Sequence, residues 1–191
     1  MADPIVTEGT PVLREKAKEV PKAMFGTKEL NGIIARMSAS MRTTHNGVAI
    51  AAPQIGVSYR IFLVAGFVIA GNKRNLEDPD VAFINPKLIR KSRKKNVTEE
   101  GCLSVPGIYG MIVRSEKAAV KAKDPAGKKF ERGGTGLLAQ IFQHECDHLE
   151  GILFIDTATD LHKDTSTSLS AGEPRDRTVP RVEAEAPHQE P

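Results

Sequence analysis

One short segment places two histidines and a glutamate at helical spacing in an otherwise apolar stretch. Residues 143–149 read QHECDHL, within a stretch 137–149 whose apolar side chains recur with the period of a helix. Residues four apart on a helix share a face, so His144 and His148 can both reach one metal ion. Glu145, offset by about 100° from His144, can contact a water at that ion without binding the ion itself. Such a pattern also occurs by chance in charged helices, but polar side chains on an apolar helix need a reason.

Cys146 lies in the middle of this segment but is a poor candidate for a metal ligand. Its position on the helix is about 200° away from that of His144, so its side chain points to the opposite face. We therefore expect Cys146 to pack in the core.

The third metal ligand must come from elsewhere, because a catalytic site usually has three protein ligands and one open position. Downstream, Gly151 fits the HExxHxxGxxH pattern of one metalloprotease class, but Phe154 stands where the third histidine is required. Upstream, Cys102 follows Gly101 in the segment EEGCLSVPG, residues 99–107. A buried cysteine is ordinarily core filler, but beside two histidines that lack a third ligand, a thiolate ligand is the better interpretation. Two imidazoles and one thiolate suit Fe(II), Zn, Ni or Co.

The composition indicates one folded domain followed by a polar tail. The chain has 191 residues, of which 40% are hydrophobic, enough for one domain with a core. Residues 157–191 hold no aromatic side chain and carry seven Asp or Glu against four Lys or Arg. We expect residues 1–156 to form the domain and 157–191 to be a disordered acidic tail, because so polar a segment cannot bury enough surface to fold.

Apolar periodicity predicts a second helix near the N-terminus and several short strands. The helix carries one apolar face, made of Leu30, Ile33, Ile34, Met37 and Met41. Strands are predicted at residues 59–64, 83–89, 111–113, 118–122 and 152–155, with a hairpin from 118–122 to 128–131 through the turn DPAG. Short strands together with two separate helices favour an α+β fold.

The cysteine pattern and the apolar runs indicate the cellular compartment in which we expect the protein. Two cysteines outside any CxxC pattern favour free thiols in a reducing environment. The longest apolar run, residues 61–71, is too short to cross a bilayer, which takes about 20 residues, and the first residues lack the apolar core of a signal peptide. We therefore expect a cytoplasmic protein without membrane contact. The net charge of +3 gives no reason to expect specific DNA binding.

Three motifs stand in an order typical of a known family. They are GVAIAAPQ at 47–54, EGCLS at 100–104 and QHECDHL at 143–149. Through them the sequence resembles peptide deformylase over roughly residues 4–156. One position departs from the family pattern, because Ala49 replaces the second glycine of the first motif.

The resemblance implies a fold, a reaction and a cofactor. The implied fold has small antiparallel sheets packed around the central metal-binding helix, with an N-terminal helix, in a deformylase catalytic domain of residues 1–156. The implied reaction is the hydrolytic removal of the formyl group from the N-terminal formyl-methionine of newly made polypeptides, by a metal-activated water with a glutamate as general base. The implied cofactor is one divalent metal ion, Fe(II) in the first place, with Zn, Ni or Co fitting the same ligands.

The resemblance also assigns residues to these roles. The implied metal ligands are Cys102, His144 and His148. The implied catalytic residues are Glu145 as the base, with the Gln54 amide and the Leu103 backbone N–H as donors to the oxyanion. The implied substrate-binding residues are Gly47, Val48, Ala49, Gly101 and Ile141.

Two other functions are compatible with these residues. A metallopeptidase of the HExxH type is opposed by the missing downstream ligand, and a deformylase-like binding protein would result if Ala49 abolished turnover. Glu100 and Arg114 form either a surface pair or a pair that fixes the Cys102 segment, while Asp147 orients a histidine or binds a neighbouring strand. The basic run RKSRKK at 90–95 is predicted to be a solvated strand end, with weak, salt-dependent ribosome association as the sharper alternative.

Overall fold

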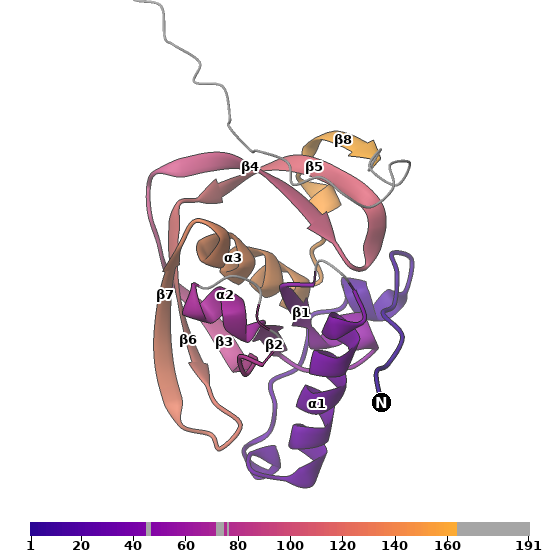
Figure 1. Ribbon diagram of the computed structural model, residues 1–191, viewed down its shortest axis with the longest axis vertical. Helices are drawn as coiled ribbons and strands as arrows, with labels where there is room; N and C mark the ends of the chain where they lie inside the picture. Colours follow the sequence, from indigo (N-terminus) through magenta and orange to yellow (C-terminus); the bar gives the residue numbers. More distant parts are fainter. Residues whose placement is uncertain (45–46, 72–74, 76, 164–191) are drawn as a thin grey trace, which may run out of the picture.

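Two antiparallel sheets and a helix between them make up most of the structure (Figure 1). The computed structural model describes residues 1–44, 47–71, 75 and 77–163. The larger sheet has the strand order β1-β2-β3-β6-β7, and the smaller sheet has the order β4-β5-β8. This arrangement confirms the predicted α+β fold with small antiparallel sheets around a central helix.

The elements follow one another along the chain with short connections. The α-helices are α1 (Lys28–Arg42), α2 (Gly66–Ala70) and α3 (Leu137–Leu149), and the 3₁₀ helices are η1 (Pro11–Arg14), η2 (Lys22–Met24), η3 (Ala52–Ile55) and η4 (Phe154–Asp156). The strands are β1 (Ala49–Ala51), β2 (Ile61–Val64), β3 (Val81–Lys91), β4 (Lys95–Cys102), β5 (Val105–Ser115), β6 (Lys117–Lys123), β7 (Lys129–Thr135) and β8 (Thr159–Lys163). Among the helices that the structure describes, none combines the length and the hydropathy needed to span a bilayer.

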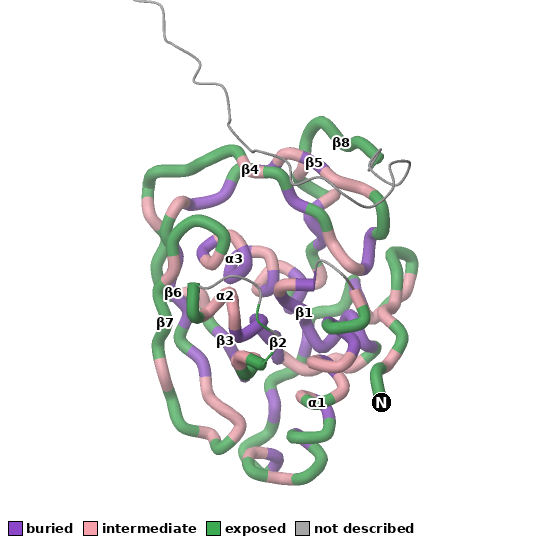
Figure 2. Tube along the Cα trace, in the orientation of Figure 1, coloured by how far each residue is buried: buried purple, intermediate pink, exposed green. Residues whose placement is uncertain are grey.

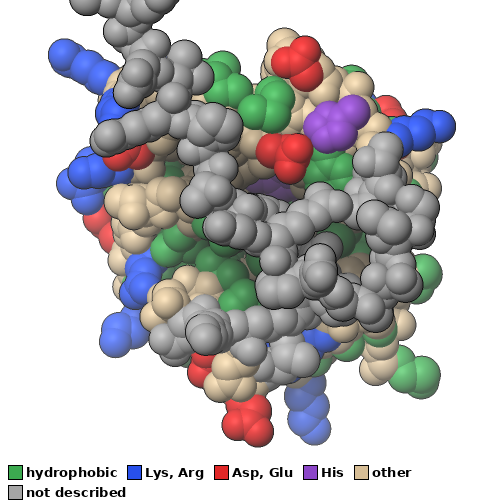
Figure 3. Space-filling model, turned by 45° about the horizontal axis from the view of Figure 1, so that its top comes forward, with side chains coloured by type: hydrophobic (Ala, Val, Ile, Leu, Met, Phe, Trp, Pro, Cys, Tyr) green, Lys and Arg blue, Asp and Glu red, His purple; other side chains and the backbone are tan. Residues whose placement is uncertain are grey.

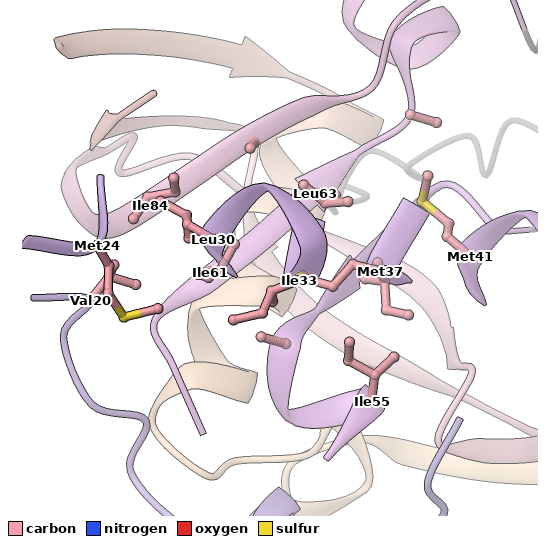
Figure 4. Packing of buried hydrophobic residues seen from close by; sticks show 14 residues of the cluster. Val20, Met24, Leu30, Ile33, Met37, Met41, Ile55, Ile61, Leu63 and Ile84 are labelled. Atoms are coloured by element: carbon pink, nitrogen blue, oxygen red, sulfur yellow. The ribbon is translucent and has the colours of Figure 1, made fainter. Parts of the chain in front are cut away.

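Helix α1 forms where the sequence predicts it. It begins after Thr27, whose side-chain oxygen accepts a hydrogen bond from the Leu30 N–H at 3.3 Å and so satisfies one of the free donors of the first turn. One face of the helix is buried against the larger sheet (Figure 4), and its members are Leu30, Ile33, Met37 and Met41.

Strand β2 is buried on both faces, because a helix covers each face of the larger sheet. Ile61 and Leu63 belong to the core beneath α1, whereas Phe62 belongs to the core beneath α3. The Phe62 ring stacks on Phe83 of β3 with centroids 4.6 Å apart, and Phe142 of α3 meets the Phe83 ring edge-on at 5.3 Å. Buried positions accordingly gather on β1, β2 and α3 at the centre of the molecule (Figure 2). Helix α3 is thereby held against the core on one side, which leaves its other side for chemistry.

Residues 152–155 do not form the predicted strand. They lead into the 3₁₀ helix η4, where the Asp156 carboxylate accepts hydrogen bonds from the Leu153 N–H at 2.9 Å and from Arg14 at 2.6 Å. The Asp156 side chain thus accepts a backbone hydrogen bond that a neighbouring strand would accept in a sheet. The apolar residues ILFI alone did not indicate this.

The folded part of the chain also extends further than the predicted boundary at residue 156. Residues 159–163, placed by the sequence in a disordered tail, form β8, which pairs with β5 through Tyr109 and His162. All five side chains of β8 are exposed, so no apolar pattern marked the strand, and backbone hydrogen bonds to the edge of β5 hold it. The rest of the predicted tail, residues 164–191, lies outside the described residues.

The core beneath α1 yields a prediction about stability. Met37 is fully buried in it, so Met37→Ala should lower the free energy of unfolding by about 2–5 kcal/mol, through lost apolar contact and the cavity left behind. Urea denaturation followed by circular dichroism measures this change. Asn31→Ala on the exposed face of the same helix should change the value by less than about 0.5 kcal/mol. Equal effects of the two substitutions would contradict the packing of α1.

Candidate metal centre and substrate cavity

Three side chains that could hold a metal ion converge at one end of α3. Cys102 ends β4, while His144 and His148 lie one turn apart on α3, and one ligand atom from each lies within 4.8 Å of the others. The Cys102 sulfur lies 3.1 Å from Nε2 of His148, although 46 positions separate them in sequence. The structure therefore brings together the three residues that sequence reasoning singled out as ligands.

Cys146 lies on the other face of α3, as predicted. Its side chain packs against the core that contains Phe62 and Phe142. Burial raises the pKa of the Cys146 thiol to about 12, so it stays protonated and unsuited to bind a metal. The aromatic ring of Phe154, which replaces the third histidine of the metalloprotease pattern, stacks on His144 with centroids 6.4 Å apart.

A buried carboxylate orients one of the two histidines. Glu100 on β4 lies 2.8 Å from Nδ1 of His144 and receives two hydrogen bonds from Arg114 on β5, at 2.8 and 3.0 Å. Because Nδ1 of His144 is engaged with Glu100, Nε2 is the ring nitrogen that remains for a metal ion. Burial alone would raise the pKa of Glu100, but the hydrogen bonds from His144 and Arg114 lower it to about 2. The Glu100–Arg114 pair therefore holds His144 in place as well as β4, the strand that ends at Cys102.

Asp147 binds the neighbouring strand. Its carboxylate accepts a hydrogen bond from Arg114 at 2.5 Å, so it holds the guanidinium from the side opposite Glu100. The sequence left two roles open for Asp147, orienting a histidine or binding a neighbouring strand, and the structure shows the second. Arg114 thus joins α3, β4 and β5 in a single network.

Glu145 is almost fully buried beside the three ligand side chains. Burial raises the pKa of its carboxyl group to about 7, an effect that the neighbouring His144 partly offsets. Its Oε2 atom is buried and has no hydrogen-bond partner among the described residues. A buried carboxylate oxygen of this kind calls for a proton or for a donor such as water, and its pKa suits proton exchange near neutral pH.

The Gln54 amide has one fixed orientation. Its oxygen accepts a hydrogen bond from the Ala51 N–H at 2.8 Å, and its NH₂ group faces Ser104 Oγ at 3.2 Å and the Cys102 sulfur at 3.5 Å. The side chain therefore closes the turn of η3 with one end and presents its donors to the site with the other. Ser104 is fully buried and was not assigned a role from the sequence, although it lies inside the EGCLS motif.

A cavity of about 560 Å³ opens beside these residues. Its lining includes each residue that the resemblance implied for the substrate, namely Gly47, Val48, Ala49, Gly101 and Ile141, together with Gln54, Leu103, His144 and Glu145. Sequence reasoning missed a further part of the cavity wall, Pro106–Tyr109, where no polar or periodic signal marked the residues. A larger hollow of about 750 Å³ between α2 and β7 contains none of the ligand side chains, so size alone does not locate the chemistry.

Two glycines of this cavity are required by close contacts. A Cβ atom at Gly101 would lie 2.7 Å from the Tyr109 ring, and one at Gly47 would lie 2.3 Å from the backbone oxygen of Met41. Ala49, by contrast, is accommodated in β1, where it pairs with Val64 and is 8% exposed. The methyl group at this position therefore adds to the cavity wall without disturbing the strand.

The donor set fits a divalent cation. Burial lowers the pKa of His148 well below its usual range, so its imidazole is neutral and able to bind a metal. Burial would also lower the pKa of His144, but contacts with Cys102 and Glu100 raise it well above the usual value. The surroundings of His144 thus favour positive charge at this point, which a metal ion would supply.

Comparisons with known proteins agree with this geometry. A family model described as polypeptide deformylase matches residues 2–164. The chain belongs to the peptide deformylase family.

Individual relatives have similar length and fold. A peptide deformylase of Desulforudis audaxviator is 40% identical over 162 residues, which are 83% of this chain and 95% of the relative. One from Halothermothrix orenii is 44% identical over 148 residues, covering 78% and 88% of the two chains. The crystal structure of a class I type b peptide deformylase from Acinetobacter baumannii, bound to Met-Ala-Ser, superposes with a TM-score of 0.72 at 35% identity, covering 82% of this chain and 99% of that one. The chain is accordingly a deformylase, a metal-binding hydrolase concerned with N-terminal processing in protein biosynthesis.

The geometry of α3 predicts that substitutions of Cys102 and of Cys146 will affect metal binding differently. Cys102→Ser should lower the affinity for a divalent metal at least tenfold, because a hydroxyl is a poor substitute for a thiolate. Cys146→Ser, on the opposite face, is the matched control and should keep the metal at full stoichiometry. Metal analysis of protein prepared without oxygen, followed by titration with a chelator, measures both. Loss of metal from the Cys146 variant alone would overturn the assignment.

Proposed function

We propose that this deformylase hydrolyses the formyl group from the N-terminal formyl-methionine of newly made polypeptides, releasing formate and a free amino terminus. The observation that carries the proposal is the convergence of Cys102, His144 and His148 within 4.8 Å, beside Glu145 and Gln54 in one cavity. The Met-Ala-Ser peptide bound by the Acinetobacter baumannii relative has the sequence of a deformylated chain end, which supports the choice of substrate. We place the reaction in the cytoplasm, where free cysteines such as the two of this chain are typical.

Cys102, His144 and His148 would hold one divalent metal ion. When bound there, the ion supplies Lewis acidity for the activation of water and of the formyl carbonyl. One thiolate and two imidazoles form a borderline-soft set that accepts Fe(II), Zn, Ni or Co, and we propose Fe(II) as the native ion on the family resemblance. The network of Glu100 and Arg114 keeps His144 in the tautomer that binds metal.

Glu145 would act as the general base. Its free Oε2 atom accepts a proton from the attacking water, and a pKa of about 7 lets the same carboxyl group return the proton to the departing amine. A water thereby attacks the formyl carbon while its proton stays within the site.

Gln54 and Leu103 would stabilise the negative charge that develops on the formyl oxygen. The Gln54 oxygen is committed to Ala51, so its NH₂ group is directed to the site before substrate arrives. The Leu103 N–H belongs to the turn that follows Cys102 and is proposed as the second donor. A preorganised donor of this kind typically contributes about 3 kcal/mol to lowering the barrier.

The methionine side chain would enter the apolar part of the cavity. Val48, which directly precedes β1, and Ile141 of α3 give the cavity branched apolar walls. Gly47 and Gly101 leave room for the peptide backbone. We propose that these residues, with Ala49, select an unbranched apolar first residue.

Removal of the proposed base tests this mechanism. Glu145→Gln should keep the metal and the fold but lower kcat at least 100-fold, because the amide cannot accept the proton. Formate release from a formyl-Met-Ala-Ser peptide by protein loaded with Fe(II) or Ni(II) measures the change. Full activity of this variant would rule out Glu145 as the base. Cleavage of an internal peptide bond by the wild type would favour a metallopeptidase, and a metal-loaded wild type without any turnover would favour a binding protein.

The departure at position 49 can be tested separately. Ala49→Gly removes one methyl group from the cavity wall, so KM for formyl-methionyl peptides should change by less than about tenfold while bulkier first residues gain relative to methionine. Steady-state kinetics with peptides that begin with formyl-Met and formyl-Phe measure this ratio. An unchanged ratio would mean that the Ala49 methyl plays no part in selectivity.

A further inference from the structure

Ser104 joins the two segments that carry the proposed donors to the formyl oxygen. Its hydroxyl oxygen accepts a hydrogen bond from Nε2 of Gln54 at 3.2 Å, and its backbone N–H donates to the Cys102 sulfur at 3.4 Å. Ser104 is fully buried, so water does not compete for these contacts. Leu103, the second proposed donor, directly precedes Ser104 in the chain. One buried residue therefore contacts Gln54 and Cys102 and adjoins Leu103.

One segment near the N-terminus holds the backbones of both Gln54 and Ser104. The Val6 N–H donates to the Gln54 carbonyl oxygen at 2.9 Å, and the Glu8 N–H donates to the Ser104 carbonyl oxygen at 2.8 Å. Because Val6 and Glu8 are only two residues apart, the chain between them limits how far apart the backbones of Gln54 and Ser104 can lie. The hydrogen bond between the two side chains is thus made from backbones that are already held in place.

The Gln54 amide needs a second contact, because a single hydrogen bond leaves its plane free to rotate. Its oxygen accepts the Ala51 N–H at 2.8 Å, which determines the end of the amide that faces the site. The terminal torsion of a glutamine side chain has a broad distribution, so this contact alone does not direct the two N–H bonds. The hydrogen bond to Ser104 at the opposite end of the amide fixes the plane.

The two N–H bonds of Gln54 then point to different surroundings. Gln54 and Cys102 are among the described residues that line the substrate cavity, whereas Ser104 is not. The N–H that donates to Ser104 therefore points into the protein. Because the NH₂ group is planar, the other N–H is directed toward the side of the Cys102 sulfur, which lies 3.5 Å from Nε2. This is the side on which a formyl oxygen would lie.

The direction of this second N–H matters because the cavity offers no cationic side chain to a developing negative charge. Neither Lys nor Arg occurs among the described residues of its lining, and the Lys and Arg side chains visible in Figure 3 project mainly from the outer edge of the molecule. Apart from the groups proposed to hold the metal, neutral N–H donors must therefore meet the charge. Such donors are effective only when they are directed in advance at the place where charge develops.

We infer that Ser104 is the positioning residue that sets the plane of the Gln54 amide and so directs its second N–H at the formyl oxygen. The inference rests on the proposed function, in which Gln54 stabilises the negative charge of that oxygen. Small errors in the placement of a group that acts in the transition state cost much of the rate. A residue that only stabilised the fold would instead affect the melting temperature and leave kcat unchanged.

A double-mutant cycle on Ser104 and Gln54 tests this role. Ser104→Ala removes the acceptor but keeps the backbone N–H that donates to Cys102, and Gln54→Ala removes the donor. Ser58→Ala is the matched control, because the Ser58 hydroxyl oxygen is also buried but has no hydrogen-bond partner among the described residues. Formate release from a formyl-Met-Ala-Ser peptide gives kcat and KM of each metal-loaded protein. The sulfur-to-cobalt absorption band of the Co(II)-loaded proteins reports on the Cys102 sulfur.

Ser104→Ala should lower kcat about tenfold and change KM by less than about threefold, since the lost interaction is made in the transition state. Gln54→Ala should lower kcat about 100-fold. Adding Ser104→Ala to Gln54→Ala should lower kcat by less than a further factor of about two, because no amide remains to be positioned. The metal content and the cobalt band of Ser104→Ala should equal those of the wild type, and Ser58→Ala should keep the wild-type kcat.

Three results would overturn the inference. The first is a metal-loaded Ser104→Ala protein with the kcat of the wild type, whatever its melting temperature. The second is a loss of activity in the double variant equal to the product of the two single losses. The third is a changed cobalt band in Ser104→Ala, which would mean that the hydroxyl acts through the Cys102 sulfur. A wild type that releases no formate would contradict the proposed function itself, so the two failures are distinguishable.

Discussion

The buried carboxylate of Glu100 is the interaction on which the site and the smaller sheet both depend. It meets Arg114 and His144 with its two oxygens while its side chain is 3% exposed. Removing one partner from such a pair leaves an uncompensated charge in the interior, which typically costs about 3–5 kcal/mol. The pairing of β4 with β5, the rotation of α3 about its axis and the tautomer of a histidine are therefore coupled. A change that loosens the sheet also changes the geometry of the proposed metal ligands.

Much of this site could be predicted because His144, Glu145 and His148 lie in one short segment of the sequence. Because His144 and His148 are four residues apart on a helix, they share a face independently of the rest of the fold. The same helical geometry excludes Cys146 as a metal ligand, because its side chain lies on the opposite face. Cys102 required a search for a missing ligand, since its approach to His148 is set by tertiary structure. The roles proposed for Gln54 and Leu103 rest on the peptide deformylase motifs, because no periodicity indicates them.

The parts that sequence patterns missed depend on tertiary contacts. Strand β8 has five exposed side chains and exists because β5 offers an unpaired edge. The apolar run 61–71 divides into β2 and α2 because Gly71, at φ 67°, ends a short helix, whereas apolar letters alone do not separate a buried strand from a buried helix. Tyr109 has no pattern of its own, and its position follows from its pairing with Gly101.

The ligand set of this site is also a cross-link between distant parts of the chain. Cys102 belongs to the smaller sheet, and His148 belongs to the helix that packs on the larger one, 46 positions later. An ion held by both would close a loop of that length, and loop closure restricts the unfolded chain more than the folded one. Since a ligand that binds only the native state stabilises it by mass action, the supply of metal would set how firmly the two sheets of the enzyme hold together, as well as how fast it turns over.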